Sequence, residues 1–114
     1  MQMHEYFEVL PQITMIPQKI LPNSNPWRIK VNLLQPHPDA GEHHPWHTDS
    51  TNSYTSMIYY INDSDGDTFL NKVETQRITP KANTAVIFPS NLWHASSNPT
   101  KGRRIVLNYM VEMT

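Results

Sequence analysis

Residues 54–61 read YTSMIYYI, and this density of β-branched and aromatic side chains predicts a β-strand. The sequence NDSDG at residues 62–66 follows directly and predicts a turn, in which the Asp-Gly pair favours a tight hairpin. Before the strand, residues 35–45 hold three prolines and one glycine, which predicts a loop. Further back, residues 28–34 (RIKVNLL) alternate polar and apolar side chains, as a half-buried strand does.

Short strands are also predicted after the turn, at residues 68–70, 72–78, 84–88, 93–97 and 104–111. Ten prolines against three glycines in 114 residues argue against an all-α fold, because proline stops helices. Closely spaced short strands are typical of an antiparallel sandwich or jelly-roll barrel, so an all-β fold is expected. Four prolines fall in residues 1–27, where we expect short extended or single-turn pieces that lie across the barrel.

The length of the chain fits one domain, with residues 1–27 as an N-terminal covering segment and residues 28–114 as the barrel. Nine basic and ten acidic residues leave a net charge of −1, which argues against a nucleic-acid partner. The absence of cysteine excludes disulfides, thiolate metal sites and a cysteine nucleophile. The longest apolar run, residues 57–61, is too short for a membrane span, and the first ten residues lack a signal-peptide pattern. We therefore expect a cytoplasmic protein that has no membrane partner.

Residues 43–49 read HHPWHTD and hold a candidate metal site. His47 and Asp49 are two positions apart, so on an extended segment both side chains point to the same side. Alone, this pair is equally well explained as a surface histidine beside a turn aspartate. His94 adds a third candidate ligand, in FPSNLWH at residues 88–94, where one predicted strand ends and the next begins. Two histidines and one carboxylate form the ligand set of non-haem Fe(II) oxygenases.

Arg104 opens the last predicted strand and is the candidate anion-binding residue. It shares a strand face with Val106 and Asn108, whereas Arg103 points to the opposite face. A charged residue at the head of an otherwise apolar strand needs an anion beside it, and the arginine fork suits the carboxylate of a co-substrate. The other face forms an apolar row, which we expect residues 1–27 or a second copy of the chain to cover: Ile105, Leu107, Tyr109 and Val111, with Met57, Tyr59 and Ile61.

The order His-x-Asp, His, Arg resembles the Fe(II)/2-oxoglutarate-dependent oxygenase superfamily, above all its prolyl 4-hydroxylase-like branch and the short, phage-type members. The resemblance covers residues 28–112 and implies a double-stranded β-helix with iron bound by His47, Asp49 and His94. It implies that 2-oxoglutarate pairs with Arg104 and accepts a hydrogen bond from Tyr60, that O2 is the oxidant, and that ascorbate stimulates turnover. Two features depart from the family: Val106 replaces a frequent serine, and residues 1–27 replace the usual N-terminal helices.

The resemblance further implies hydroxylation of a C–H bond in a peptidyl (prolyl) or small-molecule substrate, with release of succinate and CO2. A cupin-type metal enzyme is one alternative, because residues 89–98 approximate the second cupin motif. Against it, Asp49 stands where the cupin pattern has a second histidine. A non-catalytic jelly-roll binding module, in which the three candidate ligands are incidental, is the other alternative. A homodimer through the apolar outer row is compatible with each of these functions.

Overall fold

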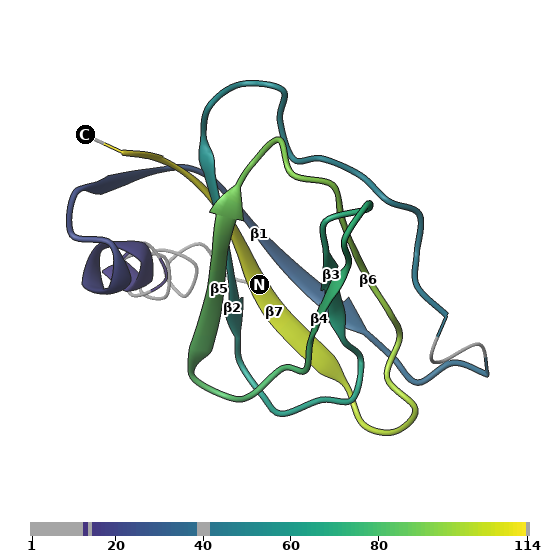
Figure 1. The fold of residues 1–114 in the computed structure, drawn as a ribbon. Helices are drawn as coiled ribbons and strands as arrows, with labels where there is room; N and C mark the ends of the chain where they lie inside the picture. The colour runs from purple at the N-terminus through teal and green to yellow at the C-terminus, as the bar shows by residue number, and fades with distance from the viewer. Residues whose placement is uncertain (1–12, 14, 39–41, 114) are drawn as a thin grey trace.

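The computed structural model describes residues 13, 15–38 and 42–113. In this part of the chain, residues 15–20 are helical and the rest is strand and loop (Figure 1). None of the helical residues described belongs to a helix that is long and apolar enough to cross a membrane. The strands are β1 (Ser24–Leu34), β2 (Thr55–Tyr60), β3 (Thr68–Leu70), β4 (Gln76–Ile78), β5 (Thr84–Pro89), β6 (His94–Ser96) and β7 (Arg104–Met113).

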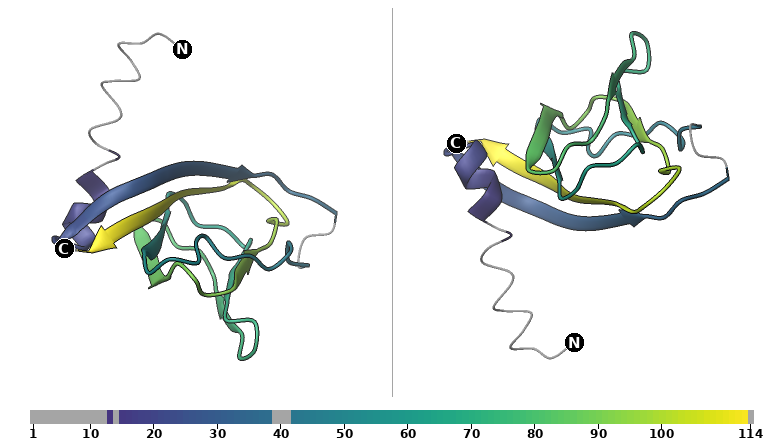
Figure 2. Two further views of the ribbon diagram at one scale, coloured as in Figure 1. Left: turned by 90° about the horizontal axis from the view of Figure 1, so that it is seen from above. Right: turned by 90° about the horizontal axis from the view of Figure 1, so that it is seen from below.

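The strands form two antiparallel sheets, with the orders β1-β7-β2-β5 and β4-β3-β6. Isolated bridges from His43 to Ser97 and from His47 to His94 place residues 43–47 beside β6, at the free edge of the smaller sheet. Figure 2 shows the long β1–β7 pair along one side of the molecule and the shorter strands on the other. β2, β5 and β7 lie in the larger sheet and β3, β4 and β6 in the smaller, so the chain passes repeatedly from one sheet to the other, as in a double-stranded β-helix. The expected all-β fold is confirmed.

Alternation along β7 and β2 separates two apolar clusters, one inside the barrel and one outside. Inside, Val106 packs with Ile58, Tyr60, Leu70 and Phe88. Outside, the buried members are Met57, Leu107, Tyr109 and Val111, and they pack against Ile13, Ile16 and Leu21 of the N-terminal region. The Tyr109 hydroxyl donates a hydrogen bond of 2.8 Å to the carbonyl of Ile13. The predicted two faces of residues 104–111 are therefore present, and residues from the N-terminal region cover most of the outer row.

The predicted hairpin at residues 62–66 is wrong, although the turn is present. β2 pairs with β5 and β7, and the chain that leaves β2 crosses to the other sheet to form β3. The Asn62 side chain fixes this crossing, because it donates to the carbonyl of Arg103 and accepts from the backbone N–H of Ile105. Turn residues set the local bend, whereas burial between the sheets selects the strand partners.

Three other boundaries differ from the sequence-based expectation. The strand predicted at residues 72–78 is limited to β4, because Asn71 adopts φ 70° and its side chain accepts hydrogen bonds from the backbone of Val73 and Glu74. Residues 15–20 form a helix of more than a single turn, where shorter pieces were expected; residues 1–12 and 14 lie outside the described residues. β1 begins at Ser24 rather than at residue 28, and it tolerates Pro26 because it is an edge strand.

A β-bulge interrupts the pairing of β1 with β7. Pro26 pairs with Val111 but Arg28 pairs with Met110, so that Trp27 is one extra residue in β1. A bulge of this kind changes which side chains point to a given face of the sheet. After Trp27, the side chains at positions 28, 30 and 32 therefore share the inner face with the even-numbered residues of β7. The Trp27 ring itself stacks on Tyr54, with ring centres 5.7 Å apart.

Candidate active site

Three sequence-predicted side chains converge on one point between the sheets. His47 lies on the bridged segment, Asp49 follows two residues later, and His94 opens β6. Their candidate ligand atoms all lie within 4.8 Å of one another. The Oδ1 atom of Asp49 is 3.2 Å from Nε2 of His94 and 3.8 Å from Nε2 of His47. Two backbone hydrogen bonds between His47 and His94, of 3.0 and 2.9 Å, bring the two segments together.

Contacts behind the three side chains fix their orientation. The Ser56 hydroxyl donates to Oδ2 of Asp49 at 2.6 Å, which leaves Oδ1 directed at the histidines. Nδ1 of His94 lies 3.0 Å from the carbonyl of Leu92; because a carbonyl only accepts, Nδ1 carries a proton, and Nε2 is the nitrogen that can bind a metal. Such outer contacts are typical of metal-binding histidines and carboxylates. Ser56 was not among the predicted site residues, although its inward parity with Tyr60 was a usable signal.

The electrostatics of His47 and Asp49 favour the forms that bind a cation. Burial lowers the pKa of His47, and nearby His94 and Lys30 lower it further, so this imidazole is neutral at pH 7. Burial raises the pKa of Asp49, but hydrogen bonds from His94 and Ser56 outweigh burial and leave it below the usual value. For His94 burial lowers the pKa, but the hydrogen bond to Asp49 more than compensates and raises it, so a cation that binds Nε2 displaces a proton from it. Two imidazoles and an ionised carboxylate with open space on one side fit a divalent first-row metal ion.

The cluster lies in a pocket of about 230 Å³. Besides the three candidate ligands, the pocket is lined by side chains from the inner faces of β1 and β7, at positions 28, 30 and 32 and at positions 104 and 108. Arg104 is only 2% exposed. The sequence-predicted metal and anion-binding residues therefore share one cavity. Arg103, the rejected neighbour, is exposed.

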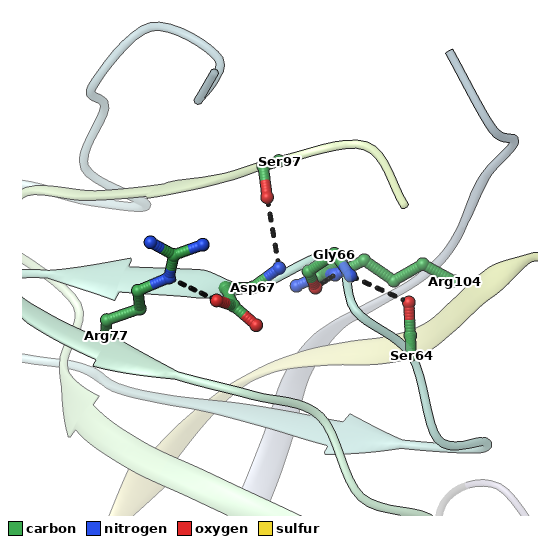
Figure 3. A network of polar contacts seen from close by, with 6 residues as sticks. All are labelled: Ser64, Gly66, Asp67, Arg77, Ser97 and Arg104. Carbon is green, nitrogen blue, oxygen red and sulfur yellow. Dashed lines mark hydrogen bonds and ion pairs between the residues drawn. The ribbon is translucent and has the colours of Figure 1, made fainter. Parts of the chain in front are cut away.

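Arg104 is held by neutral oxygens and has no acidic partner among the residues that the structure describes. Its Nε donates to the carbonyl of Gly66 at 2.8 Å, and its Nη2 donates to Oγ1 of Thr68, also at 2.8 Å. Figure 3 shows Arg104 beside Gly66, and it shows the nearby Asp67 turned toward Arg77, with which Asp67 forms an ion pair. Burial lowers the pKa of Arg104. A buried guanidinium without a counter-ion is costly, so the site suits the carboxylate of a ligand.

Tyr60 lies in the same network but does not line the pocket. Its hydroxyl is 2.7 Å from Oγ1 of Thr68, and the guanidinium carbon of Arg104 is 6.0 Å from the centre of its ring. Burial raises the pKa of Tyr60, which keeps the phenol protonated. Thr68 thus links both predicted anion-binding residues, and the sequence analysis did not identify it. The three-residue strand β3 is buried at every position, so alternation provided no signal for Thr68.

Gly66 is required for the position of Arg104. A Cβ atom at this glycine would lie 2.6 Å from the carbonyl oxygen of Ser97 and 3.0 Å from Cδ of Arg104. Real Cβ atoms essentially never approach backbone oxygen so closely. The close approach of the Arg104 stem to the backbone of residues 66 and 97 is therefore possible only because residue 66 has no side chain.

Comparisons with known proteins support the interpretation of this geometry. Residues 30–112 match the family model of the 2OG-Fe(II) oxygenase superfamily. A search of curated proteins gave no match. Among solved structures, the chain is similar to the non-heme monooxygenase ThoJ in its nickel complex, with 13% identity and a TM-score of 0.67 over 90% of this chain and 50% of that chain.

Two further solved structures share the fold. A prolyl 4-hydroxylase from Phytophthora capsici matches with 19% identity and a TM-score of 0.59, over 94% of this chain and 40% of that chain. A cupin protein from Bacteroides fragilis matches with 14% identity and a TM-score of 0.54, over 82% and 69% of the two chains. The chain thus spans half of the ThoJ chain and 40% of the prolyl 4-hydroxylase chain. Sequence identities this low show a common fold alone.

The family match includes all four of the residues that carry the sequence motif, namely His47, Asp49, His94 and Arg104. It confirms the superfamily that these residues predicted. Because the match spans most of the chain, the protein belongs to the 2OG-Fe(II) oxygenase superfamily, whose chemistry depends on Fe(II), 2-oxoglutarate and O2.

Proposed function

We propose that the protein is an Fe(II)- and 2-oxoglutarate-dependent dioxygenase that hydroxylates a C–H bond of a peptidyl, in particular prolyl, or small-molecule substrate. In the balanced reaction, the substrate C–H bond, 2-oxoglutarate and O2 become the alcohol, succinate and CO2. The observation that carries the proposal is the shared pocket, in which the donor atoms of His47, Asp49 and His94 lie within 4.8 Å of one another and a buried Arg104 lacks an acidic partner.

In this proposal His47 and His94 bind the metal through Nε2, and Asp49 binds it through Oδ1. When bound, Fe(II) and 2-oxoglutarate supply the activation of O2 that oxidises the substrate. The protein has to hold its ligands in the correct form, and Ser56 and the carbonyl of Leu92 do so for Asp49 and His94. No further acid–base pair of the protein is needed for the oxidation.

Arg104 pairs with the distal carboxylate of 2-oxoglutarate in this proposal, through a charge-assisted hydrogen bond. The hydrogen bonds to Gly66 and Thr68 fix the plane of its guanidinium through Nε and Nη2, so that Nη1 is the nitrogen offered to the ligand. Tyr60 supports this end of the pocket through Thr68. Ile58 lines the cavity and Val106 packs against it, so apolar side chains limit the access of water between the metal and Arg104.

We further propose that the chain forms a single oxygenase domain. The division into a covering segment, residues 1–27, and a barrel, residues 28–114, is supported by the packing of Ile13, Ile16 and Leu21 on the outer face. The start of β1 at Ser24 places the strand boundary a few residues earlier than this division.

The proposal is tested by anaerobic titration of the protein with Fe(II) and 2-oxoglutarate. Chelation of the metal by the 2-oxo and C1-carboxylate oxygens is expected to produce a visible charge-transfer band. The band should require higher 2-oxoglutarate concentrations in Arg104→Gln and be unchanged in Arg103→Gln, because the latter side chain is exposed. Absence of the band in the wild-type protein would contradict the proposal.

Turnover is then measured as succinate release with O2 and ascorbate, against peptide and metabolite libraries. Product formation that depends on 2-oxoglutarate supports the oxygenase. Metal-dependent turnover that is indifferent to 2-oxoglutarate would instead indicate a cupin-type enzyme on the same barrel. Failure of the protein to retain any divalent metal would indicate a binding module without catalysis.

A further inference from the structure

The inner face of β1 presents two cations to the pocket that the proposed reaction does not use. Arg28 and Lys30 both line the cavity, on the wall next to β7. Lys30 pairs across the strands with Asn108, which also lines the cavity, and Arg28 pairs with Met110. Arg104 is at the opposite end of the same inner face of β7. The partners of Lys30 and Arg28 on β7 lie four and six residues after Arg104, so the two cations are displaced along the strand from the proposed 2-oxoglutarate carboxylate site.

Neither cation is paired with a carboxylate among the residues that the structure describes. Within residues 13, 15–38 and 42–113, no ion pair involves Arg28 or Lys30. The pocket lining holds three cationic side chains and one carboxylate, Asp49, which is already bonded to His94 and Ser56. This local excess of two positive charges contrasts with the net charge of −1 of the whole chain. Binding of a divalent iron and the dianion of 2-oxoglutarate adds no net charge, so the excess persists in the loaded enzyme.

The bulge at Trp27 is responsible for this placement. Without the extra residue, the alternation that sends Pro26 to the outer face would send Arg28 and Lys30 to the outer face as well. Lys30 and the candidate metal ligands His47 and Asp49 line the same cavity. A substrate group that binds to Lys30 therefore lies next to the position where a C–H bond would be oxidised.

We propose that Arg28 and Lys30 are specificity-determining residues that bind an acidic group of the substrate, a carboxylate or a phosphate. This inference rests on the proposed oxygenase function, and it defines the substrate class as anionic. Both side chains are exposed at the pocket wall, where their charges can attract an anionic substrate and orient it relative to the metal. Asn108, directly opposite Lys30, is placed to donate a further hydrogen bond to the same group.

A charged side chain on an edge strand can also serve only to prevent pairing with another chain. That role requires charge but no ligand, so it predicts no preference for acids over neutral analogues. Measured ligand selectivity therefore separates the two explanations.

The test uses 15N-labelled protein loaded with Zn(II), which replaces iron and prevents turnover, and with saturating 2-oxoglutarate. The probes are N-acetyl-L-proline, N-acetyl-L-prolinamide and methyl phosphate. Because 2-oxoglutarate already fills the Arg104 site, N-acetyl-L-proline or methyl phosphate should cause saturable shifts in the backbone N–H signals of residues 28–32 and 108. The neutral N-acetyl-L-prolinamide should cause none. The stronger of the two anions identifies the acidic group.

Variants assign the effect to the two side chains. Arg28→Gln and Lys30→Gln should each weaken binding of the anion about tenfold, the typical loss of one hydrogen bond to a charged group. Lys30→Glu should abolish it, whereas Lys81→Gln, an exposed lysine outside the pocket, should have no effect. The affinity for 2-oxoglutarate, followed by the Fe(II) charge-transfer band, should be unchanged in all of them.

Three results would overturn the inference. The first is equal signal shifts from N-acetyl-L-proline and N-acetyl-L-prolinamide, and the second is no saturable shift from either anion. The third is weaker 2-oxoglutarate binding in the Arg28 and Lys30 variants. The last result would assign these cations to the co-substrate. Failure of the proposed function is recognised separately, because the wild-type protein would then lack the charge-transfer band.

Discussion

At the scale of single residues, the contact between Ser56 and Asp49 determines which carboxylate oxygen faces the histidines. Ser56 is buried and its hydroxyl lies 2.6 Å from Oδ2 of Asp49, so the carboxylate cannot rotate without losing a strong hydrogen bond. The same bond lowers the pKa of Asp49 and keeps the carboxylate ionised. A metal-binding role for Asp49 therefore depends on a side chain that is not itself a ligand.

Substitution Ser56→Ala is expected to weaken divalent metal binding about tenfold or more, because a ligand that is free to rotate is less well preorganised. The affinity is measured by competition of Zn(II) with a chromophoric chelator. Asp49→Ala, which removes the proposed ligand, defines the lower limit of the assay, and Ser53→Ala, an exposed serine on the same segment, is the control. Equal affinities for Ser56→Ala and Ser53→Ala would show that the hydrogen bond has no role in metal binding.

At the scale of the elements, the turn before β3 and the start of β7 are coupled through Gly66. The substitution Gly66→Ala places a methyl group 2.6 Å from the carbonyl oxygen of Ser97 and 3.0 Å from Cδ of Arg104. We expect a loss of about 2 kcal/mol in the free energy of unfolding, as for overpacked sites. We also expect weaker 2-oxoglutarate binding, because the Arg104 side chain has to move. Urea unfolding and the Fe(II) charge-transfer titration measure the two effects.

Gly102→Ala is the matched control for this substitution. Gly102 has a φ of 69°, which an alanine adopts at a cost of about 1 kcal/mol, but nothing lies within 4 Å of the added Cβ. It should therefore lower stability without changing the affinity for 2-oxoglutarate. If Gly66→Ala behaves in the same way as Gly102→Ala, the glycine is not needed to position Arg104.

The packing of the N-terminal helix on β7 predicts a loss of stability at alkaline pH. Burial, with a smaller contribution from Tyr59, raises the pKa of Tyr109 from 10.0 to about 12. Below pH 10 the phenol keeps its proton in both the folded and the unfolded chain, so its contribution to stability is complete. Between pH 10 and 12 the unfolded chain releases this proton while the folded chain retains it, and the free energy of unfolding falls.

Comparison with Tyr109→Phe isolates this contribution from the titration of other groups. The variant lacks the hydrogen bond to Ile13, worth about 1 kcal/mol at neutral pH, but it also lacks the titrating group. The difference in unfolding free energy between wild type and variant should therefore decrease from pH 9 toward pH 12, as followed by urea unfolding. A difference that stays constant across this range would contradict the shifted pKa.

The sequence predicts those elements whose signal is local, and it misses those that depend on contacts between distant segments. The alternation in residues 104–111 and the aromatic strand at residues 54–61 identify β7 and β2 because one face of each strand is apolar throughout. The partner of β2 after the NDSDG turn could not be predicted, since the turn residues say nothing about which sheet the next strand joins. Thr68 was missed because its strand is buried on all sides.

The same distinction applies to the candidate site. The convergence of His47, Asp49 and His94 and the inward side chain of Arg104 agree with the sequence analysis, while their roles as ligands stay predictions. Strand parity indicated His47, Asp49 and Arg104, whereas His94 was indicated by residue type and the order of the motif. The inward-facing cations of β1 could not be predicted as pocket residues, because the bulge at Trp27 has no signal in the sequence. Tyr60 was predicted through the family resemblance, and its direct hydrogen bond to the co-substrate stays a prediction.

At the scale of the whole molecule, the outer face of the larger sheet is only partly covered. Met57 and Val111 have no exposed surface beneath the N-terminal helix, whereas Val31, Leu33 and Ile61 stay 58%, 46% and 42% exposed. Exposed apolar side chains in this number favour association with another surface. A homodimer through the uncovered part of this face stays a prediction.

The helical residues provide a test of the role of the cover. Ile16→Asp should destabilise the protein by about 2 kcal/mol and promote self-association, because the charge cannot remain packed on Leu107 and Tyr109. Ile20→Asp, on the same helix but 38% exposed, should have little effect on either property. Sedimentation velocity over a range of concentrations measures the association. A monomeric and stable Ile16→Asp protein would show that the covering contacts are dispensable.

The extra residue in β1 has a consequence for how this small fold tolerates change. Before Trp27, the strand belongs to the helical cover, since the backbone N–H and the hydroxyl of Ser24 both donate to the carbonyl of Leu21. After it, the strand belongs to the cavity. Because of the bulge, the alternation of side chains between the two sheet faces before Trp27 does not fix the alternation after it. An insertion or deletion at Trp27 would change which residues of β1 face the cavity without changing which residues contact the helical cover, so the two stretches can vary separately.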